Sequence, residues 1–146
     1  MESPLHHTLF DSLEELRNCL RSLTSGRRAI WVTESNCADL CLDRIGIEAA
    51  DIVLPPGEEA KTAEQLLRLW SGLTDLGVTR GDLMIAVGGG ALLDVVGLSA
   101  ATYKRGMGLV YVPTTLLADV DASTSVCVRT CYFRCTHRKD EERGKQ

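Results

Sequence analysis

Residues 82–103 read DLMIAVGGGALLDVVGLSAATY, and this stretch decides the fold class. A short apolar run leads into three consecutive glycines, and a segment rich in Ala, Leu and Val follows. This order predicts a buried strand, a tight turn and a helix. Glycines let a ligand approach the backbone, and the first N–H groups of a helix attract anions. The turn is therefore a candidate nucleotide site, although its spacing is not G-x-G-x-x-G and a plain strand-to-helix turn gives the same pattern.

The same alternation extends outward in both directions. Short apolar, β-prone runs predict strands at 29–33, 50–54, 82–87 and 108–112. Apolar residues at helical spacing predict a helix capped by Asp11, a short helix over 36–44, and a helix over 61–76 that ends at Gly77. Parallel strands need helical crossovers, so we predict an α/β fold with an open, mostly parallel Rossmann-like sheet and the glycines at a carboxyl strand end.

Length and composition fit one globular domain of 146 residues, of which 45% are apolar and 25% charged. The apolar runs are too short for a membrane span, and no secretory signal precedes them, so we expect a cytoplasmic protein with no membrane partner. Without an export signal, the six cysteines are expected to be reduced. The net charge of -4 gives no reason to expect a nucleic-acid partner. His6 and His7 are expected at a flexible, exposed end.

Residues 88–123, GGGALLDVVGLSAATYKRGMGLVYVPTTLLADVDAS, contain several motifs in a fixed order. A triple glycine is followed by an aspartate four residues on, by A-A-T-Y-x-R-G, and by P-T-T-L-L-A-x-V-D-[SA]-S. The upstream run that ends in PGEEAKT (residues 56–62) matches P-x-G-E-x-x-K-[ST]. Together these motifs resemble the 3-dehydroquinate synthase family.

The resemblance implies roles for individual residues. The expected cofactor-binding residues are Glu34, Asn36, Glu58, Lys61, Gly89, Gly90, Asp94, Thr114 and Thr115. Asp121 is the expected catalytic residue near the reacting centre, and Arg105 the expected ligand of the substrate phosphate. Each assignment has a structural alternative: an exposed acid and base at a helix start for Glu58 and Lys61, caps for Asp94 and the threonines, and a helix C-terminus for Arg105.

In the family, the reaction implied is the NAD-dependent cyclisation of a heptulosonate phosphate to 3-dehydroquinate, with phosphate elimination, in the shikimate pathway. A C-terminal helical domain supplies ligands for zinc or cobalt, and the full-length enzyme is expected to be a homodimer. Neither that domain nor any metal ligand can be named here, so we expect the chain to be catalytically incomplete. Alternatives are a related sugar-phosphate cyclase, then a glycerol or iron-dependent alcohol dehydrogenase, or a non-catalytic nucleotide-binding remnant.

The resemblance stops at Ser123, which divides the chain into an NAD-binding α/β domain (1–123) and an unrelated tail (124–146). The family continues G-G-K-T-[GA] where this chain reads TSVCVRT, and the tail carries six Lys+Arg against three Asp+Glu. We interpret it as a disordered tail that results from a broken reading frame, a mis-spliced product or an assembly error. The alternative, a soft-metal site, would use Cys127, Cys131, Cys135 and His137.

Overall fold

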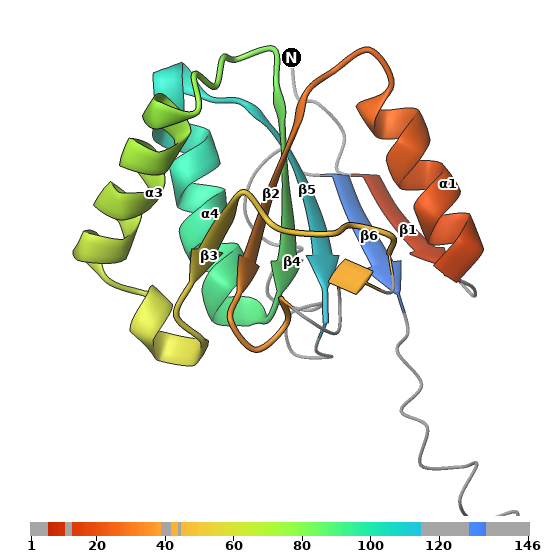
Figure 1. The fold of residues 1–146 in the computed structure, drawn as a ribbon, viewed down its shortest axis with the longest axis horizontal. Helices are drawn as coiled ribbons and strands as arrows, with labels where there is room; N and C mark the ends of the chain where they lie inside the picture. The colour runs from red at the N-terminus through yellow and green to blue at the C-terminus, as the bar shows by residue number, and fades with distance from the viewer. Residues whose placement is uncertain (1–5, 11–12, 39–41, 44, 115–128, 134–146) are drawn as a thin grey trace, which may run out of the picture.

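The computed structural model describes residues 6–10, 13–38, 42–43, 45–114 and 129–133. Within these residues, six parallel strands form one sheet in the order β1-β6-β5-β4-β2-β3, and helices cover both of its faces (Figure 1). The elements in chain order are β1 (His6–Phe10), α1 (Leu13–Thr24), β2 (Ala29–Glu34), β3 (Ile52–Leu54), η1 (Gly57–Ala60), α3 (Ala63–Asp75), β4 (Leu83–Gly88), α4 (Gly90–Thr102), η2 (Tyr103–Arg105), β5 (Gly108–Pro113) and β6 (Arg129–Phe133).

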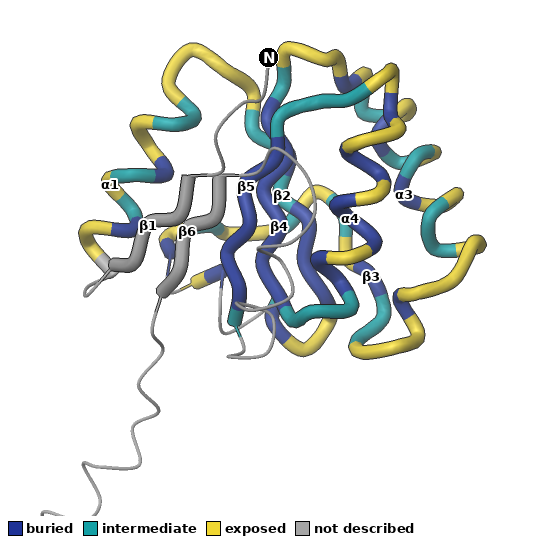
Figure 2. Tube along the Cα trace, turned by 180° about the vertical axis from the view of Figure 1, so that it is seen from behind, coloured by how far each residue is buried: buried dark blue, intermediate teal, exposed yellow. Residues whose placement is uncertain are grey.

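The centre of the sheet is buried on both faces, as the continuous dark strands of Figure 2 show. Successive side chains of a strand point to opposite faces, so β4 contributes to two cores. Ile85 and Val87 join the core under α1, whereas Met84 and Ala86 join the core under α3 and α4. This two-sided burial explains why the strand is a continuous apolar run rather than an alternating one.

Local sequence signals fix both ends of α3. The Thr62 side chain accepts a hydrogen bond from the backbone N–H of Gln65 at 3.1 Å and caps the helix start. At the other end, Gly77 adopts φ +66°, and the N–H of Val78 bonds to the carbonyl of Leu73 at 3.0 Å. This is a Schellman ending, which favours glycine at that position. The predicted helix end at Gly77 is confirmed.

The four predicted strands are neighbours in the order β5-β4-β2-β3, and the triple glycine follows the carboxyl end of β4, both as expected. The outer strands were not predicted. We expected a flexible N-terminus and a tail without regular structure, but residues 6–10 and 129–133 form β1 and β6, which pair with each other. β6 contains Thr, Tyr and Phe, which favour strands, and the charge of the surrounding tail concealed this signal.

The predicted helix over 36–44 falls partly outside the described residues. A turn occupies residues 35–38, and residues 42–43 are helical. Asp11, the expected cap of the first helix, also lies outside the described residues. The described part of the chain contains no helix long and apolar enough to cross a membrane.

Candidate functional site

The connections that leave β2 and β4 lie on opposite faces of the sheet. The connection from β2 to β3 places Leu42 and Ile45 in the core under α1, whereas α4, which follows β4, packs over the other face. Because β2 and β4 are adjacent, the strand order reverses between their carboxyl ends. In open α/β sheets, the crevice at this position binds ligands.

Among the described residues, no side chain caps the backbone amides at the N-terminus of α4, which follows the carboxyl end of β4. Gly89 is the N-cap residue and offers no side-chain hydrogen bond, and no acidic residue lies in the first turn. The first N–H groups of any helix have no acceptor within the helix. In α4 the first helical hydrogen bond is donated by the N–H of Leu93 to the carbonyl of Gly89, at 3.1 Å. The turn therefore presents partial positive charge to an anion.

Three polar side chains meet at the carboxyl ends of β2, β4 and β5. The thiol of Cys37 donates to the Glu34 carboxylate, with Sγ 3.5 Å from Oε1, and lies 3.7 Å from the hydroxyl of Thr114. The N–H of Thr114 donates to the carbonyl of Gly88 at 2.9 Å. Glu34 is only 8% exposed although it is ionisable, so its side chain is largely shielded from solvent at this end of the sheet.

A second group of charged side chains borders the N-terminal half of α4. Lys61 Nζ lies 2.9 Å from Asp94 Oδ2 and 3.8 Å from Glu58 Oε1. The Lys61–Asp94 pair spans from the start of α3 to the first turns of α4, and both side chains are partly exposed. Beside it lies a mainly apolar pocket of about 380 Å³, lined by Lys61, Thr62, Ala63, Leu66, Asp94, Val95 and Leu98.

Tyr111 lies beneath the middle of α4, where its hydroxyl approaches Gly97. Burial raises the pKa of its hydroxyl to about 12, and the negative charge of Asp94 adds to the shift. A side chain at Gly97 would meet the Tyr111 hydroxyl, so the glycine lets the helix pass directly over the ring. The hydroxyl therefore stays protonated at neutral pH and cannot act there as a base.

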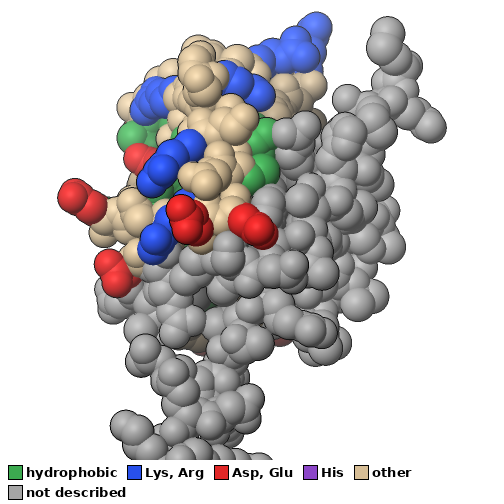
Figure 3. Space-filling view, turned by 90° about the vertical axis from the view of Figure 1, so that its right-hand side faces the viewer, with side chains coloured by type: hydrophobic (Ala, Val, Ile, Leu, Met, Phe, Trp, Pro, Cys, Tyr) green, Lys and Arg blue, Asp and Glu red, His purple; other side chains and the backbone are tan. Residues whose placement is uncertain are grey.

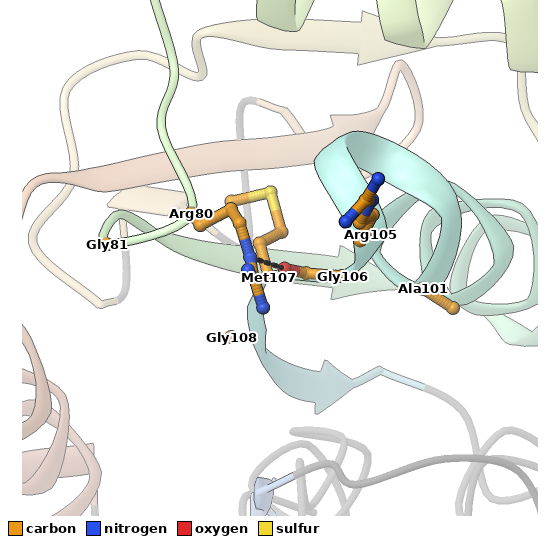
Figure 4. A pocket seen from close by; sticks show the side chains of 7 residues that line it. All are labelled: Arg80, Gly81, Ala101, Arg105, Gly106, Met107 and Gly108. Carbon is orange, nitrogen blue, oxygen red and sulfur yellow. Dashed lines mark hydrogen bonds between the residues drawn. The ribbon is translucent and has the colours of Figure 1, made fainter.

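Arg105 lies at the opposite end of α4, next to the amino ends of the strands. It lines a pocket of about 620 Å³ together with Arg80, whose Nε donates to the carbonyl of Gly106 at 3.2 Å (Figure 4). The backbone is strained here, because Lys104 and Arg105 have φ of +45° and +69°. On the molecular face in Figure 3, Lys and Arg side chains gather toward the amino ends of the strands and Asp and Glu toward the carboxyl ends.

The expected cofactor residues therefore form two groups that flank one helix start. Lys61 contacts both Asp94 and Glu58, while Glu34, Thr114 and the glycine turn lie around the crevice between β2, β4 and β5. Asn36 is exposed in the turn after β2. Thr115 and Asp121 lie outside the described residues.

Sequence reasoning missed Cys37 and Tyr111. No motif marks either residue; only the position of Cys37 just after the end of β2 could have drawn attention to it. Among the described residues, no group of three or more His, Cys, Asp or Glu side chains could hold a metal ion. The cysteines and histidine of the proposed tail site fall on residues whose side chains are not described.

Comparison with known proteins places this geometry in a family. The family model described as 3-dehydroquinate synthase N-terminal matches residues 51–131, more than half of the chain and past the expected boundary at 123. A 3-dehydroquinate synthase from Pyrococcus abyssi is 38% identical over 123 residues, covering 82% of this chain and 37% of that protein. The enzyme from Chlamydia trachomatis serovar L2 is 39% identical over 127 residues, covering 82% and 33%. The chain thus spans about a third of the length of these relatives.

Solved structures with the same fold include two sugar-phosphate cyclases. The 2-epi-5-epi-valiolone synthase of Streptomyces hygroscopicus, with NAD+ and Zn2+ bound, has a TM-score of 0.70 at 22% identity and covers 91% of this chain and 43% of its own. A 2-deoxy-scyllo-inosose synthase has a TM-score of 0.67 at 23% identity, covering 87% and 42%. At this identity the structures show the shared fold, and the family match carries the assignment: the chain belongs to the 3-dehydroquinate synthase family, of which it contains an N-terminal domain.

Proposed function

We propose that this chain is the NAD-binding part of a 3-dehydroquinate synthase and that it is catalytically incomplete by itself. The observation that carries the proposal is the uncapped N-terminus of α4 at the crevice between β2 and β4, with a buried carboxylate beside it. A dinucleotide has an anionic pyrophosphate, which the amides of the helix N-terminus can bind, and a ribose diol, which can donate hydrogen bonds to the carboxylate.

Each side chain then has a role that its position supports. The amides of Gly90 and its neighbours bind the pyrophosphate, and Glu34 accepts hydrogen bonds from the adenosine ribose. Lys61 offsets the charge of Asp94, so that a dianionic ligand does not meet an unpaired carboxylate. Bound NAD would supply hydride acceptance. The described residues include no group that fits a divalent metal, so no step through a metal is assigned to them.

Arg105 requires a different arrangement if it binds substrate phosphate. α4 has 13 residues and is about 20 Å long at 1.5 Å per residue, so its two ends cannot hold one small ligand. We propose that Arg105 binds the substrate phosphate in the nucleotide site of a second copy of the chain. This arrangement agrees with the expected homodimer of the full-length family. The same location leaves open its simpler role as a cation that complements the helix C-terminus.

The test is nucleotide binding measured separately from turnover. We expect calorimetry to detect NAD binding by this chain, and we expect no phosphate release from the heptulosonate phosphate substrate, with or without added zinc. A full-length relative is assayed in parallel as the positive control. NAD binding by the relative but not by this chain would contradict the cofactor assignment, and turnover by this chain equal to the relative's would contradict its incompleteness.

A related sugar-phosphate cyclase is the second candidate, because two cyclases of that type share the fold. The relatives of 38–39% identity favour 3-dehydroquinate synthase instead. Exchanging the homologous segment of a full-length 3-dehydroquinate synthase for residues 51–114 of this chain would test the ranking. Retained 3-dehydroquinate formation by the chimera is the expected result.

A further inference from the structure

The Glu34 carboxylate is held by a hydrogen-bonded chain that begins on another strand. Cys37 has one thiol proton, and the thiol donates it to Glu34 Oε1 at 3.5 Å. Toward Thr114, whose hydroxyl lies 3.7 Å away, the sulfur is then the acceptor. The resulting order is Thr114 hydroxyl, Cys37 sulfur, Glu34 carboxylate, and it links the end of β5 to the end of β2 across the crevice.

This chain of contacts restricts a side chain that would otherwise rotate. A glutamate has several rotatable bonds, and ordering it has a cost in entropy. Here burial and the thiol contact remove that freedom before any ligand arrives, since Cys37 is 7% exposed and Glu34 8%. The carboxylate lies directly beside Gly88: a Cβ at that glycine would be 3.5 Å from Glu34 Cδ. The oriented acceptor therefore lies next to the turn that leads to the uncapped helix.

We propose that Cys37 is a positioning residue for nucleotide selection: its thiol orients Glu34 so that the carboxylate accepts from a ribose diol and repels a phosphate ester at the same position. The inference rests on the proposed function, because it assumes that the crevice binds a dinucleotide. A buried carboxylate and a ribose phosphate are both anions, and their repulsion is strong where water is excluded. An unrestrained Glu34 could turn away and weaken this discrimination.

The experiment compares NAD with NADP for three chains: the unaltered protein, Cys37→Val and Cys37→Ser. Valine keeps the apolar volume but has no donor, whereas serine restores both donor and acceptor. We expect Cys37→Val to weaken NAD binding about fivefold, the equivalent of one typical hydrogen bond, with less than twofold change for NADP. Cys37→Ser should keep an NAD-to-NADP ratio within about twofold of the unaltered protein.

If the role of Cys37 were purely structural, Cys37→Val would weaken the binding of NAD and of NADP equally. The ratio of the NAD affinity to the NADP affinity is therefore the diagnostic measurement. The inference is overturned if Cys37→Val keeps the unaltered ratio, or if Cys37→Ser loses it to the same extent. Thermal melting identifies a variant that fails to fold; Cys37→Ala then replaces Cys37→Val in the same comparison. An unaltered chain that binds neither nucleotide overturns the proposed function as well, whereas normal NAD binding with an unchanged ratio overturns the role of Cys37 alone.

Discussion

The two ends of α4 are only a helix length apart, yet they differ in charge and in strain. At the N-terminal end no described side chain caps the amides, and Lys61 is paired with Asp94 in the first turns of the helix. At the C-terminal end two consecutive cations, Lys104 and Arg105, lie in a left-handed backbone, and in the described part of the chain Arg105 makes no salt bridge. One end is therefore suited to recognise an anion through main-chain groups, and the other through side chains.

This difference shows how nearness in sequence can mislead. Gly90 and Arg105 belong to one continuous motif, but the helix between them carries one to the carboxyl edge of the sheet and the other to the amino edge. Within one chain, the glycine turn and Arg105 therefore cannot contact the same small ligand.

The largest expected effect comes from placing the same charge at each end. Gly90→Asp introduces a carboxylate into the first turn of α4, where it stabilises the helix but repels a pyrophosphate, so we expect about 100-fold weaker NAD binding. Arg105→Asp is the matched control and should change NAD affinity less than about twofold. Isothermal titration measures both variants. Equal losses at the two ends would show that the nucleotide does not bind at the glycine turn.

The second prediction concerns pH and the Tyr111 hydroxyl beneath the middle of α4. The pKa of Tyr111 is raised from 10.0 to about 12 in the folded chain, so its contribution to stability is complete below pH 10 and is lost as the pH rises to 12. We expect the free energy of unfolding to fall by about 3 kcal/mol over this range from this group alone. Urea titrations of the unaltered chain and of Tyr111→Phe measure the difference. If both chains lose the same stability between pH 10 and 12, the phenol is not buried as described.

The strain at the C-terminal end gives the third prediction. A left-handed conformation costs a residue with a side chain about 1–2 kcal/mol relative to glycine. The greater conformational freedom of glycine in the unfolded chain offsets part of this advantage. We expect Arg105→Gly to be about 1 kcal/mol more stable than Arg105→Ala, as measured by the urea midpoint. The alanine variant controls for the loss of the guanidinium. The reverse order of stability would indicate that residue 105 does not adopt a positive φ.

The smallest effect is expected for the ion pair at the N-terminal end. Lys61 and Asp94 are 39% and 45% exposed, so solvent and salt screen their attraction. A double-mutant cycle with Lys61→Ala and Asp94→Ala should give a coupling energy below about 1 kcal/mol for folding. The coupling should decrease further in 1 M salt. A value of several kcal/mol would mean that the pair is shielded from water and structurally essential.

The sequence was most informative where one physical signal dominated. The inner strands β2, β4 and β5 are largely buried on both faces, so their apolar runs identified them, and the apolar stripe together with Gly77 marked α3. The outer strands β1 and β6 gave no comparable signal, because polar and charged residues interrupt them.

The candidate site was predictable to the extent that motifs record it. The glycine turn and the residues Lys61 and Asp94 were named from a resemblance in sequence. The ion pair between Lys61 and Asp94 and the contacts of Cys37 depend instead on how separate elements approach one another. Such a contact joins residues 37 and 114, and no local pattern encodes it. The pocket at Arg105 was missed for the same reason, since the motif does not specify which edge of the sheet the arginine reaches.

The pairing of β1 with β6 has a consequence for synthesis on the ribosome. Within the described sheet, β1 lies at the edge and pairs with β6 alone, with His6 opposite Arg129, so the first strand of this sheet to be made has to wait for the last. At elongation rates of about 5–20 residues per second, that interval lasts from several seconds to about half a minute. During it, β2 to β5 can already assemble, whereas β1 has no neighbour to bond. A nascent chain stalled before residue 129 should thus hold a protected central sheet and an N-terminal segment that proteases still cleave.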